Sequence, residues 1–61
     1  MSAEHNAIRA AVKLLIDNHL VWSSDFELVR PFLLGVLMEQ LAEPTPRLDY
    51  VRLAKDLVRA T

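Results

Sequence analysis

Apolar residues recur every three or four positions in three segments of this chain, at about residues 3–21, 24–42 and 46–60. This spacing places them on one side of an α-helix, whereas a strand would need apolar and polar residues in alternation. No segment alternates in that way, and none carries the turn signal of a hairpin. Short connections favour antiparallel neighbours. The sequence therefore predicts an all-α fold, a small three-helix bundle that forms one domain over residues 1–61.

The first segment has the form of an amphipathic helix from about Ala3 to Val21, with Ser2 as its N-cap. At about 100° per residue, one side of this helix gathers the apolar residues Ile8, Ala11, Val12, Leu15 and Trp22. The opposite side gathers the polar residues Asn6, Arg9, Lys13 and Asp17. The apolar side is expected to face the core.

The third segment follows the run Glu43-Pro44-Thr45-Pro46. Pro44 cannot extend the preceding helix, Thr45 is expected to be the N-cap, and Pro46 suits the first helical position. The helix should run to about Arg59 or Ala60. Its expected apolar side consists of Tyr50, Leu53, Ala54, Leu57 and Val58, and a basic ridge of Arg52, Lys55 and Arg59 lies opposite.

The middle segment begins with Ser24-Asp25-Phe26-Glu27, which has the form of a capping box, and continues to about Ala42. Pro31 lies inside it, where a proline removes one backbone hydrogen bond and clashes with the carbonyl four residues earlier. Either the helix kinks, or a short helix stops at Val29 and another begins at Pro31. Because no other turn-forming residue lies nearby, we favour one continuous helix with a kink at Pro31.

This middle helix is apolar nearly all round. One apolar stripe consists of Phe26, Val29, Leu33, Leu37 and Leu41, and a second stripe of Leu28, Phe32 and Val36 lies about 100° away, with Gly35 and Met38 beyond it. Either the other two helices clasp it from both sides, or the second stripe meets another chain. A 61-residue chain is marginally stable alone. We therefore predict self-association through the middle helix, as a homodimer.

The predicted protein interface comprises Leu28, Phe32, Gly35, Val36 and Trp22. Phe32 is the expected aromatic anchor, and Trp22 is expected equally to join it or to close the end of the core. A glycine costs a helix about 1 kcal/mol relative to alanine. Close approach of another helix, within the chain or across a dimer, would explain Gly35.

Groups that could perform catalysis or bind a metal do not converge in the sequence. His5 and His19 are about 21 Å apart along one helix and cannot share a metal ion in a monomer. Glu39 and Glu43 lie four residues apart, but they are expected to be solvated. The chain has no cysteine and a single glycine, which excludes thiolate chemistry and a glycine-rich phosphate loop. We predict no enzymatic activity, no catalytic residues, and no cofactor or metal site.

Nucleic-acid binding is the alternative function. Residues 44–61 carry four basic residues, Arg47, Arg52, Lys55 and Arg59, and two acidic ones, although the whole chain has a net charge of −1. A dimer could present two such basic helices to DNA, as helix-turn-helix regulators do. However, Asp49 and Asp56 are placed to pair with Arg52 and Arg59, and the ridge lacks side chains that read bases.

The longest strictly apolar run, Pro31–Met38, has eight residues, whereas a membrane span needs about 20. We therefore expect a cytoplasmic protein with no membrane span. The favoured function is a non-enzymatic protein–protein interaction module, a regulator or adaptor that acts as a homodimer. The sequence identifies no particular protein partner.

Overall fold

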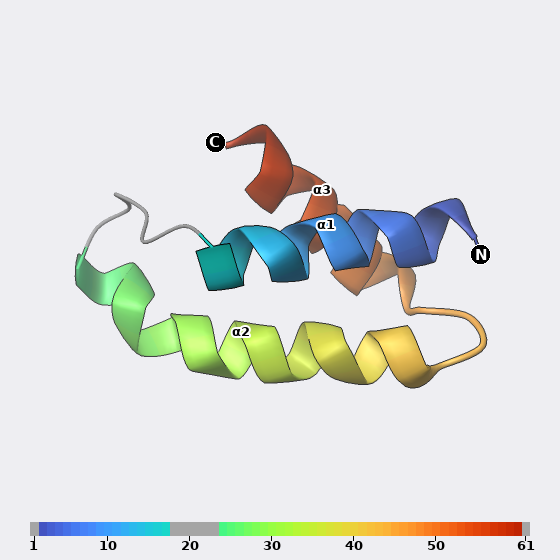
Figure 1. Cartoon of the computed structure of the whole chain (residues 1–61), viewed down its shortest axis with the longest axis horizontal. Helices are drawn as coiled ribbons and strands as arrows, with labels where there is room; N and C mark the ends of the chain where they lie inside the picture. Colours follow the sequence, from blue (N-terminus) through green and yellow to red (C-terminus); the bar gives the residue numbers. More distant parts are fainter. Residues whose placement is uncertain (1, 18–23, 61) are drawn as a thin grey trace.

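The computed structural model of the chain describes residues 2–17 and 24–60, and for residues 24–27 it describes the backbone alone. Within this part lie three α-helices, α1 (Ala3–Asp17), α2 (Ser24–Ala42) and α3 (Leu48–Arg59), and no strand (Figure 1). The predicted all-α, three-helix fold is therefore confirmed. Trp22 and His19 lie outside the described residues, as does the stretch 18–21 predicted to extend the first helix.

Helix α1 is the centre of the fold. It runs antiparallel to α2 and packs against both other helices, whereas α2 and α3 touch each other only slightly (Figure 1). Helix α3 crosses behind α1 instead of lying alongside it. Consequently α2 is covered along one face by α1, and the alternative in which two helices clasp it from both sides is wrong.

The core lies where α1 meets the other two helices. Four residues of α1 are buried there, and they are the apolar side predicted from the sequence: Ile8, Ala11, Val12 and Leu15. The other helices add Leu37, Val51, Ala54 and Leu57 to this core. Half-buried side chains packed around it are Ala7, Leu33, Leu34, Leu41, Tyr50 and Leu53. All three predicted amphipathic faces contribute, so one apolar cluster joins the three helices.

Two valines assigned to apolar core faces are exposed. Val29, expected on the core stripe of the middle helix, and Val58, expected on the apolar side of the third, are each more than two-fifths exposed. Val51, which the sequence analysis left out, is buried instead. The reason is the same in α2 and α3, because each packs mainly against α1 and buries a narrower arc than a helix with two neighbours would.

Pro31 lies inside α2, which continues as a single helix from Ser24 to Ala42. A split into two helices at Val29 is therefore wrong, and the preference for one continuous helix is confirmed. The predicted capping box at the start of this helix concerns side chains outside the description.

The sequence predicted the N-cap of α1 correctly but not that of α3. Ser2 caps α1 as predicted, since its Oγ accepts a hydrogen bond of 3.1 Å from the backbone N–H of His5. Helix α3 starts two residues later than predicted: Arg47, not Thr45, occupies the N-cap position, and Pro46 is buried just before it. Arg47 makes no capping hydrogen bond with its own side chain. A residue from another helix supplies the polar contact at this point, as described below.

Candidate interface on helix α2

The side of α2 that faces away from α1 is largely apolar. Leu28 is 83% exposed and Phe32 is 71% exposed, and Gly35 and Glu39 are exposed as well. We call Leu28, Phe32, Gly35 and Glu39 the outer face of α2. Val29 and Met38, both exposed, lie on its two flanks. The predicted interface residues Leu28, Phe32 and Gly35 thus point away from the core.

The other two predicted interface residues are Val36 and Trp22. Val36 is half-buried, at the border between the outer face and the side covered by α1. Trp22 is outside the described residues, so its predicted role stays a prediction. The candidate interface is therefore centred on Phe32 and Gly35.

The sequence of α2 explains why it has two apolar sides. The outer-face residues follow one another at spacings of four, three and four, which is the spacing of the seam positions in a coiled coil. Leu37, which is fully buried, lies about half a turn away from this seam, and half-buried Leu33 and Leu41 lie near it on the same side. One helix thus carries a core stripe and, opposite to it, a second seam that no described part of the chain covers.

Gly35 has no packing role within the described part of the chain. A Cβ atom built on it would meet no other atom within 4 Å, apart from the neighbouring residues and its own helix backbone. Its φ angle is not positive, so the backbone does not require a glycine either. Close approach of another helix within the chain is therefore wrong as its explanation, and an approach across a dimer stays a prediction.

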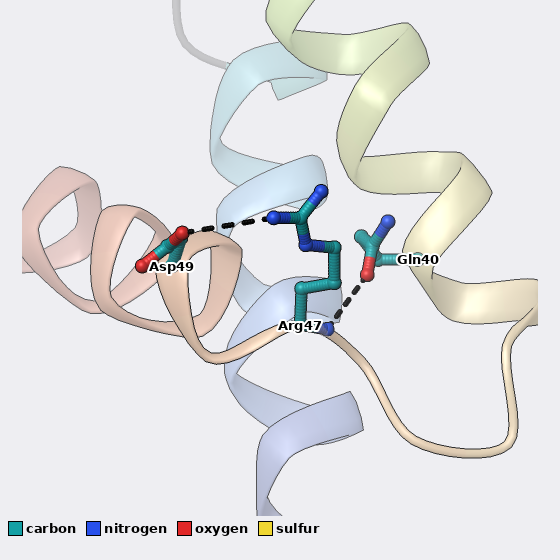
Figure 2. A network of polar contacts seen from close by, with 3 residues as sticks. All are labelled: Gln40, Arg47 and Asp49. Carbon is teal, nitrogen blue, oxygen red and sulfur yellow. Dashed lines mark hydrogen bonds and ion pairs between the residues drawn. The ribbon is translucent and has the colours of Figure 1, made fainter.

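Gln40 is a buried polar residue with a structural role that the sequence did not single out. It is the buried polar side chain of the described core, and its Oε1 accepts a hydrogen bond of 2.8 Å from the backbone N–H of Arg47 (Figure 2). This contact joins the end of α2 to the start of α3. The available signal was its position three residues after Leu37, on the core side of the helix.

Replacing Gln40 by Leu should destabilise the fold by about 1–2 kcal/mol. The substitution keeps an apolar stem of similar size but leaves the N–H of Arg47 without its protein acceptor. Urea unfolding followed by circular dichroism measures the change. As a control, Gln40→Glu keeps an acceptor oxygen and should lose less stability. Equal stability of Gln40→Leu and the unmodified chain would contradict the structural role of this hydrogen bond.

The four basic residues proposed for nucleic-acid contact are not equivalent. The guanidinium of Arg47 lies 3.9 Å from a carboxylate oxygen of Asp49 (Figure 2). It also lies 5.7 Å from the ring centroid of Tyr50. Arg52, Lys55 and Arg59 are exposed. The expected pairs of Asp49 with Arg52 and of Asp56 with Arg59 do not form among the described residues. Asp49 pairs with Arg47 instead, because the chain turns back at the start of α3.

Lys55 and Arg59 also border a shallow groove between α1 and α3, of about 340 Å³. Its floor is apolar, formed by Ala7, Ala10 and Val58.

His5 makes a second polar link between helices. Its Nε2 donates a hydrogen bond of 2.7 Å to the backbone carbonyl of Glu43, and its Nδ1 contacts the Oγ of Ser2. A carbonyl oxygen can only accept, so the proton lies on Nε2. His5 thereby joins the start of α1 to the end of α2, which is a structural task.

Among residues 2–17 and 24–60, no group of three histidine, aspartate or glutamate side chains is placed to hold a metal ion. Nor does any helix in this part reach the length and apolarity needed to cross a membrane. No protein-family model matches the chain, and neither does any curated protein or solved structure. What the chain does is therefore inferred from its own surface.

Proposed function

We propose that this protein is a small non-enzymatic interaction module, a regulator or adaptor, that forms a homodimer through the outer face of α2. The observation that carries the proposal is the exposure of Leu28 and Phe32, one turn apart on one helix face. A single exposed leucine needs no explanation, but large apolar side chains gathered on one face commonly mark a partner site.

The area of this patch fits a second copy of the chain. The exposed parts of Leu28, Val29, Phe32 and Met38 amount to roughly 400 Å² of apolar surface. Two facing patches would therefore bury roughly 800 Å², which is less than the roughly 1,200–2,000 Å² of stable specific interfaces and falls in the range of weak, transient contacts. We accordingly propose a weak dimer whose dissociation constant lies in the micromolar-to-millimolar range.

The charge distribution supports the same partner. Between Leu28 and Met38 the charged residue is Arg30, which is half-buried on the side of the helix opposite the seam. Two copies of the central part of the face can therefore meet without placing like charges together. The net charge of −1 adds little long-range repulsion between two chains.

A kink of α2 at Pro31 is part of the proposal. Proline has no N–H to donate to the carbonyl four residues earlier, and Pro31 itself is exposed between Leu28 and Phe32. A bend at this point would set the angle at which Leu28 approaches a partner relative to Phe32.

The cytoplasmic location expected from the sequence stays a prediction.

The mass of the protein in solution tests the proposal. Sedimentation equilibrium from micromolar to millimolar concentration should show the average mass rising from 6.9 kDa toward twice that value. The rise follows from mass action for a weak symmetric pair. A mass of one chain at every concentration would contradict the homodimer and remove the main support for an interaction module.

DNA binding through α3 has less support. Arg52, Lys55 and Arg59 are exposed, but Arg47 is engaged with Asp49 and Tyr50. The exposed carboxylate of Asp56 also lies among the ridge residues in sequence. Since binding to duplex DNA draws most of its affinity from unopposed cations, the interaction module remains our proposal and DNA binding the alternative.

A further inference from the structure

The outer face of α2 carries its largest and its smallest side chain next to each other. Phe32 projects from the helix with 71% of its area exposed, and Gly35, three residues later, leaves open space where a side chain would stand. Leu28 and Glu39 extend the same seam in the two directions. A seam of this kind can pair with a second copy in two orientations, and the two orientations bring different residues together.

A parallel pair would match these residues poorly. In a parallel coiled coil each seam residue faces its own equivalent. Two Phe32 rings would crowd one layer, two Gly35 residues would leave the next layer empty, and two Glu39 carboxylates would face each other. Crowding, a void and like charges in contact all weaken packing.

An antiparallel pair removes all three problems. The midpoint between Phe32 and Gly35 is also the midpoint between Leu28 and Glu39, so one two-fold axis can relate both pairs. Each Phe32 ring then lies over the glycine of the other helix, and each leucine packs against the aliphatic stem of a glutamate whose carboxylate stays in water. Large and small side chains alternate across the contact, as in a well-packed core.

We infer that two copies of α2 pack antiparallel, with Phe32 of each protomer seated on Gly35 of the partner subunit. The inference rests on the proposed homodimer and specifies its geometry. It also accounts for Gly35, which nothing within the described chain requires. A helix glycine that lowers the stability of the monomer is compensated when an aromatic ring of a second chain fills the space beside it.

Replacing Gly35 by Leu distinguishes the antiparallel packing of Phe32 on Gly35 from non-specific association of apolar surfaces. In the monomer the added side chain meets open space on a helix that favours leucine, so the chain should stay folded. In the antiparallel dimer it collides with the ring of Phe32, and the dissociation constant should rise at least about tenfold. Sedimentation and circular dichroism measure the two effects. A tighter dimer, which added apolar area or a parallel pair would produce, overturns the packing.

A compensating substitution provides the matched control. In the variant that combines Phe32→Ala with Gly35→Leu, each contact again pairs one large and one small side chain, now with the large one at position 35. The total side-chain volume in each contact is therefore close to that of the unmodified dimer. The double variant should therefore dimerise more tightly than either single variant. If the two substitutions weaken the dimer independently, Phe32 and Gly35 do not touch across the interface and the inference is wrong.

Because the chain has no cysteine, engineered disulfides can report the orientation of the two helices. In a variant that combines Leu28→Cys with Glu39→Cys, antiparallel packing places the first introduced thiol of each chain opposite the second introduced thiol of the other. Oxidation should then link two chains. Within one chain the two substituted positions are about 16 Å apart along the helix, which is too far for a disulfide. The single variant Glu39→Cys should link poorly, since its thiols would be equally far apart across the dimer.

The outcomes distinguish the two proposals. Efficient linkage of Glu39→Cys alone would indicate parallel helices, which overturns the antiparallel packing but keeps the homodimer. A chain that stays monomeric at millimolar concentration overturns the homodimer and the packing with it. Linkage in the double-cysteine variant, together with a weakened Gly35→Leu dimer, supports both.

Discussion

If the protein forms the proposed dimer, replacing Phe32 by Glu should convert that dimer into a folded monomer. The ring is 71% exposed in the single chain, so the substitution should change the free energy of unfolding of the monomer by less than about 0.5 kcal/mol. In a symmetric dimer it places two unpaired carboxylates in an apolar contact. The dissociation constant should therefore rise at least about a hundredfold. Sedimentation at millimolar concentration measures the association, and circular dichroism measures the helix content.

Leu48→Glu is the matched control for this experiment. Leu48 is 61% exposed, yet it lies on α3, away from the outer face of α2. A glutamate in the first turn of a helix is favourable, so this variant should fold and dimerise like the unmodified chain. If the Phe32→Glu variant unfolds, the Phe32 ring must belong to the core, which would contradict the structure. Unchanged dimerisation of Phe32→Glu would show that the dimer uses another surface.

Replacing Ile8 by Ala should remove most of the stability of the fold. Ile8 is fully buried on α1, the helix that both other helices pack against. Such a truncation costs about 2–5 kcal/mol through lost burial and the cavity left behind. A core of this size rarely supplies more than about 3–5 kcal/mol in total. We therefore expect a chain that is largely unfolded at room temperature, as urea unfolding monitored by circular dichroism would show.

Ile16→Ala tests the same chemical change on the same helix. Ile16 is 57% exposed, so its truncation should cost less than about 1 kcal/mol, and the better helix propensity of alanine offsets part of that cost. A large loss at Ile16 together with a small loss at Ile8 would contradict the position of the core. The pair of variants therefore checks which side of α1 is buried.

Much of the candidate interface was predictable from the sequence. The prediction rested on the two apolar stripes of the middle helix, because two neighbouring helices could hardly cover its whole circumference. Leu28 and Phe32 are exposed and Leu37 is buried, as that reasoning expected. What the sequence could not supply was the open space beside Gly35, because such a space is visible only when the neighbouring residues are placed.

Other features depended on contacts between two different segments of the chain. Gln40 has the polarity of a surface residue, and its burial follows from a hydrogen bond to Arg47 across the turn between α2 and α3. Helix α3 begins after Arg47, which occupies the N-cap position in place of Thr45, the residue that capping preferences alone had favoured. Capping preferences depend on residues within one segment, whereas the burial of Gln40 depends on the contact between two segments.

By itself the sequence determined the helices, since apolar spacing, the Ser2 cap and the proline-rich turn are properties of neighbouring residues. It also determined which broad face of α1 is buried. The tertiary structure decided which helix lies in the centre and how α3 crosses it. This arrangement of the helices determines how wide an arc of α2 and of α3 is buried. As a result Val29 and Val58 are exposed and Val51 is buried. The width depends on how many helices surround each helix, which no periodicity within a segment encodes.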